Sequence, residues 1–79
     1  MSRRQMQRKF PPGKLVTNQF GDNLMMVVGY VPTSPRVRDG RIVNAASWLV
    51  LVLWRGGLTE LHWESLNDRI ITLEDWEAK

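Results

Sequence analysis

The short length of the apolar runs is the feature that most constrains how this chain can fold. The longest run covers seven residues, from Trp48 to Trp54, and the pair Gly56-Gly57 follows almost directly. A helix needs about 20 apolar residues to span a bilayer, so no membrane-spanning segment is expected. A run of this length that ends near glycines favours a β-strand over a buried helix.

Other short apolar segments alternate with turn residues along the rest of the chain. Residues 18–23 combine Asn, Asp and Gly, which favour a turn. Gly29, inside the second apolar segment, predicts a bulge or a close backbone approach. The glycine pair predicts a hairpin, and residues 64–68 are typical of a single helical turn. Five strands are therefore expected, over residues 14–17, 24–31, 47–54, 58–63 and 69–73.

Three segments outside these strands set the predicted organisation of the chain. The first ten residues are polar and basic and run into Pro11-Pro12-Gly13, which predicts an arm. Residues 32–46 form a long loop between the second and third strands, in which an Asp39-Gly40 turn would allow residues 41–43 to pair as a short extra strand. The expected units are a basic arm over 1–10, a β-domain over 11–73 and an acidic tail over 74–79.

The order of these segments resembles the Src-homology-3-like (SH3-like) small β-barrel, as found in KOW-like and Tudor-like domains. The residues that carry the resemblance are the opening Pro12-Gly13-Lys14-Leu15-Val16, the segment Leu51-Val52-Leu53-Trp54 before the glycine pair, and Leu61-His62-Trp63 with Leu66. The resemblance implies an all-β fold, a small five-stranded barrel with a basic N-terminal arm and a long loop between strands two and three. Such barrels bind peptides, RNA, DNA or other subunits, so the fold alone does not select a function.

The hairpin at the glycine pair predicts a sheet that is apolar on both faces. If Gly56 and Gly57 are the turn residues, Val52 lies opposite Leu61, and this face forms the core. The other face holds three leucines beside Glu60 and His62, and the second strand is also apolar throughout. Such strands need cover on both sides. The cover would come from another subunit, including a second copy of the chain, or from residues 1–10 or 32–46. The candidate partner-binding residues are Met25, Val27, Leu49, Leu51 and Leu53.

Charge is distributed unevenly between the two halves of the chain. Residues 1–41 carry eight basic and two acidic side chains, a net charge of +6, whereas residues 42–79 have a net charge of −3. A basic half can attract an acidic protein or a nucleic acid, and arginine matches phosphate oxygens well. Nucleic acid is therefore the alternative partner, with Phe20, Tyr30, Trp48 and Trp54 as candidate stacking residues. The candidate anion-binding residues are Arg3, Arg4, Arg8, Lys9, Lys14, Arg36, Arg38 and Arg41.

The chemistry needed for catalysis is sparse in this sequence. It has no cysteine and one histidine, His62, which lies two residues from Glu60 without a nearby nucleophile. The acidic residues lack the spacing of a metal loop, and the glycines lack that of a phosphate loop. We therefore expect no enzyme activity, no cofactor and no metal. The predicted protein is a non-catalytic binding or assembly module of the cytoplasm, such as an accessory protein of a phage or mobile element, with nucleic-acid binding as the alternative.

Overall fold

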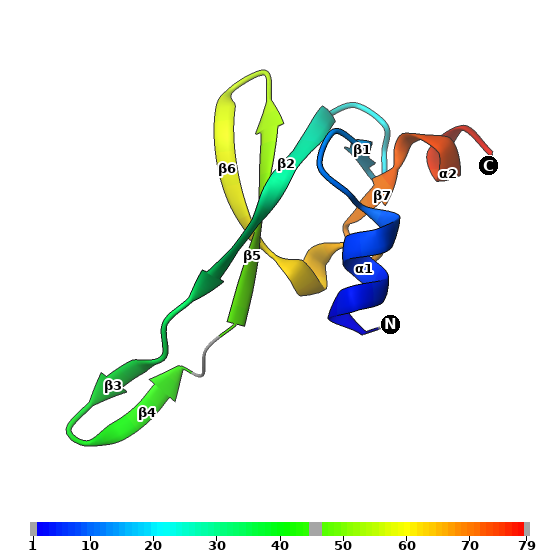
Figure 1. Ribbon diagram of the computed structural model, residues 1–79. Helices are drawn as coiled ribbons and strands as arrows, with labels where there is room; N and C mark the ends of the chain where they lie inside the picture. Colours follow the sequence, from blue (N-terminus) through cyan, green and yellow to red (C-terminus); the bar gives the residue numbers. More distant parts are fainter. Residues whose placement is uncertain (1, 45–46, 79) are drawn as a thin grey trace.

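The computed structural model describes residues 2–44 and 47–78 and shows a chain that is mostly β (Figure 1). The predicted all-β character is confirmed at this level, since the helices of the described residues are short. The elements are, in chain order, α1 (Arg3–Lys9), β1 (Leu15–Asn18), β2 (Leu24–Thr33), β3 (Arg36–Arg38), β4 (Arg41–Asn44), β5 (Ser47–Trp54), β6 (Gly57–His62), the 3-10 turn η1 (Trp63–Ser65), β7 (Ile70–Thr72) and α2 (Leu73–Glu77).

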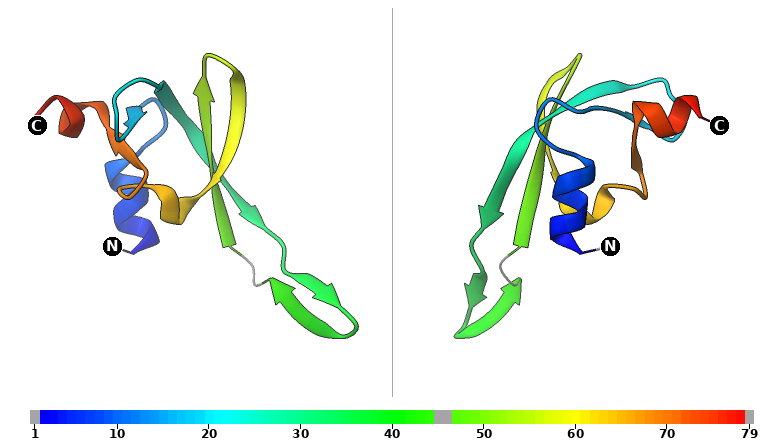
Figure 2. Two further views of the ribbon diagram at one scale, coloured as in Figure 1. Left: turned by 180° about the vertical axis from the view of Figure 1, so that it is seen from behind. Right: turned by 45° about the vertical axis from the view of Figure 1, so that its right-hand side comes forward.

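Five of the described strands form one antiparallel sheet in the order β6-β5-β2-β1-β7. All five predicted strands are present in it, with bounds that differ by a few residues. β6 and β7 are the two edges of this sheet, and no pairing between them closes it within the described residues. The other two strands, β3 and β4, form a separate ribbon that extends from one end of the sheet (Figures 1 and 2).

The hairpin between β5 and β6 has a different register from the predicted one. Val52 lies opposite Thr59 rather than Leu61, and Trp54 lies opposite Gly57, so Arg55 and Gly56 occupy the turn. Gly57 has a φ of +118°, a conformation that favours glycine, and it continues the strand instead of turning. The register differs by two residues, so every side chain keeps its predicted face.

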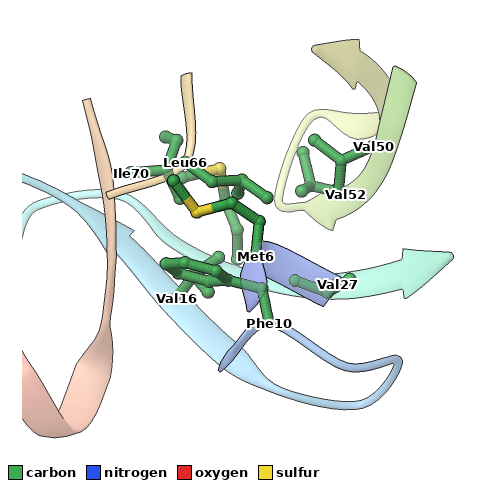
Figure 3. Packing of buried hydrophobic residues seen from close by; sticks show 9 residues of the cluster. Met6, Phe10, Val16, Val27, Val50, Val52, Leu66 and Ile70 are labelled. Carbon is green, nitrogen blue, oxygen red and sulfur yellow. The ribbon is translucent and has the colours of Figure 1, made fainter. Parts of the chain in front are cut away.

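The core lies between α1 and one face of the sheet, which we call the core face (Figure 3). Helix α1 begins at a capping box, in which Ser2 and Gln5 bond each other's backbone N–H groups. Met6 and Phe10 of the predicted arm are buried, and Phe10 is fully inaccessible to solvent. The buried apolar cluster consists of Met6, Phe10, Val16, Met25, Val27, Val50, Val52, Leu66 and Ile70.

The predicted acidic tail contains the short helix α2, which returns to the beginning of the chain. The Thr72 hydroxyl accepts a hydrogen bond from the Asp75 backbone N–H at 3.1 Å and caps the helix. The Trp76 indole ring lies against Gly21 in the turn between β1 and β2, where a Cβ would approach the ring to 2.1 Å. Glycine therefore allows the contact that holds α2 on the sheet.

Most of the predicted long loop is regular structure. β2 continues through Pro32, which lies opposite Trp48, as far as Thr33, so the predicted end of this strand at residue 31 is wrong. A proline can occupy a strand where its missing N–H is not needed in the ladder. The predicted Asp39-Gly40 turn is confirmed with φ values of +53° and +73°, and so is the strand after it, which pairs with β3.

Neither helix in the described residues is long and apolar enough to cross a membrane, since α1 has seven residues and α2 five.

Candidate functional site

The face of the sheet opposite the core face, which we call the outer face, carries a row of four apolar side chains. Leu15 of β1 lies opposite Met26 of β2, Met26 lies opposite Leu53 of β5, and Leu53 lies opposite Leu58 of β6. Leu15 and Leu53 are each 45% exposed and Leu58 is 59% exposed, while Met26 is half-buried. One line of apolar side chains thus crosses four strands without cover from the described residues.

Further apolar side chains flank this row. Leu24 lies two residues before Met26 on the same face and is exposed, and Leu51 lies two residues before Leu53 on β5 and is half-buried. The polar residue Glu60 lies opposite Leu51 and limits the apolar surface on that side. We call the whole surface the outer patch, and its residues are Leu15, Leu24, Met26, Leu51, Leu53 and Leu58.

Helix α2 covers the outer face only at the β7 end of the sheet. Thr17 of β1 and Ile71 of β7 lie opposite each other, and both are buried where α2 packs against these two strands. Neither α1 nor the β3–β4 ribbon covers the rest of this face, because α1 packs on the core face and the ribbon extends away (Figure 2). The predicted alternative, that residues 1–10 or 32–46 fold over the outer face, is therefore wrong for the described part of these segments.

The structure brings together three of the five residues predicted for the apolar partner-binding surface. Leu49, Leu51 and Leu53 share the outer face, with Leu53 exposed and the other two half-buried. The assignment of Met25 and Val27 to this face is wrong, because they lie opposite Trp54 and Val52 and are buried in the core.

A β-bulge in β2 explains this error. The register between β2 and β5 shifts between Val27 and Gly29, so Val28 is an extra residue. Val27 therefore faces the core, whereas Val31 lies opposite Leu49 on the outer face. The predicted bulge is confirmed, but a close backbone approach at Gly29 is not, since a Cβ there would meet no atom within 4 Å.

Sequence reasoning missed four members of the outer patch: Leu15, Leu24, Met26 and Leu58. The pairing of Val16 with Met25 places their neighbours Leu15 and Met26 on the outer face. The alternation of side chains along β1 and β2 would have given this result once the two strands had been paired through the turn at residues 18–23. Leu58 was overlooked because the predicted register placed it beside the turn.

The eight predicted anion-binding residues fall into three groups. Lys9 and Lys14 form ion pairs with α2, to Asp75 at 3.0 Å and Glu74 at 2.5 Å. The hydrogen bond from Lys9 lowers the pKa of the Asp75 carboxyl. These two lysines therefore hold α2 to the beginning of the chain.

The other basic residues lie at two separate places. The Arg3 guanidinium lies over the Trp48 ring, 4.6 Å from its centroid, and Arg4 and Arg8 are exposed on α1. The second place is the β3–β4 ribbon, on which the arginines at positions 36, 38 and 41 are exposed. Figure 1 shows α1 and the ribbon as separate parts of the molecule.

The candidate stacking residues have different environments. The Tyr30 hydroxyl donates to the Phe10 carbonyl at 2.7 Å, and burial raises its pKa to about 12. The Trp54 indole N–H donates to the Thr59 hydroxyl at 2.6 Å. Phe20 in the turn between β1 and β2 is 79% exposed. Tyr30 thus stabilises the core, whereas the Phe20 ring is accessible to solvent.

Of the polar side chains predicted to lack catalytic partners, His62 lies beside an open groove. Glu60 and His62 are both exposed on the outer face of β6. His62 also lines a groove of about 620 Å³, where the ribbon leaves the sheet, together with Glu64 and Arg36. In the described part of the chain, no three histidine or acidic side chains are grouped as metal ligands.

Comparison with known proteins adds no relative from which a function could be transferred. The chain matches no protein-family model, and no curated protein and no solved structure matches it.

Proposed function

We propose that this chain is a non-catalytic assembly module that binds another protein subunit through the outer patch, and that this subunit is a second copy of the chain. We also propose that its architecture is of the SH3-like type. The strand order β6-β5-β2-β1-β7 and the turn η1 that precedes β7 support this assignment, since they follow the meander and the late 3-10 turn on which the resemblance rests.

The observation that carries the proposal is the exposed row of Leu15, Met26, Leu53 and Leu58. Burying one leucine side chain stabilises a protein by roughly 1.5–3 kcal/mol. A domain of this size has only about 3–5 kcal/mol of stability, so three exposed leucines represent a large unused contribution. Contiguous exposed apolar surface with a polar rim is typical of interaction sites.

Two features favour a second copy as the occupant. The row ends at Leu58 on β6, which is an edge strand with unpaired backbone groups that another strand could use. The molecule also combines a basic first half with an acidic second half, so two copies in opposite orientation attract each other. A two-fold axis through the patch would pack the same leucines against each other.

The mass in solution tests this proposal. Light scattering on the 9.2 kDa chain should give about twice that mass at high concentration. Leu53→Glu places a charge in the middle of the row and should give the mass of a single chain. Val37→Glu is the matched control, because Val37 is also exposed but lies on the ribbon, and it should leave the mass at the higher value. A wild-type protein with the mass of a single chain at every concentration would contradict the proposal.

A further inference from the structure

The β3–β4 ribbon contains two arginines that face each other. Arg38 is directly opposite Arg41 in the strand pairing, next to the Asp39-Gly40 turn. Like charges directly opposite destabilise a strand pair. Neither of the salt bridges formed by the described residues involves the ribbon. The ribbon thus presents two neighbouring guanidinium groups that lack an anion.

The ribbon adjoins the sheet at its base, where Arg36 and Val43 line the groove beside Leu49 and His62. It extends beyond the sheet and gives the molecule its longest dimension of 48 Å (Figure 2). A two-stranded hairpin alone is marginally stable in water. Its other face carries Val37 opposite Ile42, which are 63% and 69% exposed. The folded ribbon therefore gains most stability when a partner binds it.

We propose that the ribbon binds duplex DNA, with its arginines on the phosphates beside the major groove. The major groove of B-form DNA is wide enough for a two-stranded β-ribbon. The planar guanidinium of arginine matches two phosphate oxygens at once. The ribbon carries three arginines and one acidic residue, Asp39, so its net charge is positive and negatively charged DNA attracts it.

A further basic residue lies at the base of the ribbon. Trp48 lies opposite Pro32, and the next pair, Ser47 opposite Thr33, is the last one before the ribbon begins. The Arg3 guanidinium over Trp48 is therefore at the end of the sheet from which the ribbon extends. A duplex held by the ribbon would pass near this arginine as well.

The geometry favours DNA over other anionic polymers. The major groove of A-form RNA is deep and narrow, so a β-ribbon does not enter it. An acidic polypeptide has no groove and no regular spacing of charges that matches a paired set of strands. The ribbon is also separate from the outer patch, so DNA binding is independent of the proposed assembly.

Salt-dependent binding of the full chain to labelled duplex DNA tests this inference. Three arginines on phosphates give a slope of log affinity against log salt of about −2.7, which is a loss of about 40-fold between 50 and 200 mM salt. The variant R38Q/R41Q removes two contacts, so its slope should be smaller by about 1.8. The matched control R55Q/R69Q removes the same charge from exposed arginines outside the ribbon and should keep the wild-type slope.

A second variant keeps the test valid if R38Q/R41Q disturbs the hairpin. D39N removes the acidic residue of the ribbon, and asparagine tolerates the positive φ of this turn position. It should bind the same duplex more tightly than the wild type does. All variants should keep the wild-type mass in solution, which separates this test from that of the assembly.

Several results would overturn the inference. One is the absence of binding to duplex DNA at 50 mM salt. Another is an equal reduction of the slope by R55Q/R69Q and R38Q/R41Q, which would indicate general charge attraction. Binding of duplex RNA or polyglutamate as tightly as DNA would equally contradict it, as would D39N binding no more tightly than the wild type.

Discussion

At the scale of single residues, Tyr30 and Phe10 connect α1 to the sheet. The Phe10 carbonyl lies at the end of α1, where backbone oxygens lack helical partners, and the Tyr30 hydroxyl satisfies it. The Phe10 ring fills the core between β1, β2 and β5 (Figure 3). One residue thus supplies both the polar and the apolar contact that fixes the helix.

The pKa of Tyr30 can be measured without ambiguity because the chain has one tyrosine. Burial raises this pKa to about 12, above the unfolded-state value near 10. The folded state therefore retains the proton more strongly, and the stability from this difference is full below pH 10 and is lost as the pH rises towards 12. An absorbance titration of the phenolate should show the raised pKa, and Tyr30→Phe should reduce the loss of stability over this range. A midpoint near 10 in the folded protein would contradict this account.

The two phenylalanines form a matched pair for testing the core. Phe10→Ala removes a fully buried ring and should cost about 3–5 kcal/mol of unfolding free energy. Phe20→Ala makes the same chemical change at a largely exposed position and should change it by less than about 0.5 kcal/mol. Urea denaturation followed by tryptophan fluorescence measures both, and a Phe10→Ala chain that is already unfolded without urea counts as the full loss. Similar losses in the two variants would show that residues 1–10 form an arm outside the core.

At the scale of elements, the sequence predicts the strands better than their pairing. Short apolar runs between turn residues located all five strands of the sheet, because strand length and turn chemistry are local properties. Gly57 sets the register of the β5–β6 hairpin, and the bulge at Val28 sets the face on which Val27 lies. Their effects extend along whole strands and are not local. Alternation alone could not show where the bulge reverses the faces of β2.

Helix α1 and the ribbon were difficult to predict for a related reason. The helix has only Met6 as an apolar residue within its bounds, and short helices depend on tertiary packing more than on propensity. Residues 32–46 were predicted to form a long loop, where β2 in fact continues and the ribbon lies. Contacts made far along the chain override the local signal at α1, which packs on the core, and at Pro32, which pairs with β5, whereas the ribbon pairs locally across the Asp39-Gly40 turn.

The contact between α2 and the β1–β2 turn can be tested with two glycines. Gly21 and Gly13 both have positive φ, so alanine at either position costs about 1–2 kcal/mol of backbone strain. Only Gly21→Ala would also drive a Cβ into the Trp76 ring, which adds about 1–3 kcal/mol. Chemical denaturation should therefore show Gly21→Ala to be the less stable variant. Equal stabilities would mean that Trp76 does not hold α2 in place.

At the scale of the whole molecule, most of the predicted anion-binding residues lie apart from the outer patch. The acidic end of the chain binds Lys9 and Lys14, so part of the predicted basic arm serves the fold. The other six predicted anion-binding residues are arginines on α1 and the ribbon, apart from the outer patch. The three leucines of β5 share one face as predicted, whereas Met25 and Val27 do not, and the separation of the basic residues into three places follows only from the folded chain.

The central claim is that the outer patch becomes covered when the chain assembles. Methyl-group NMR with a soluble paramagnetic probe measures this directly. Assembly should protect the methyl groups of Leu53 and Leu58 from the probe as the protein concentration rises. The methyl groups of Val37 and Ile42, which are exposed on the ribbon, should stay accessible and provide the internal control. Equal accessibility of all four residues at every concentration would contradict the claim.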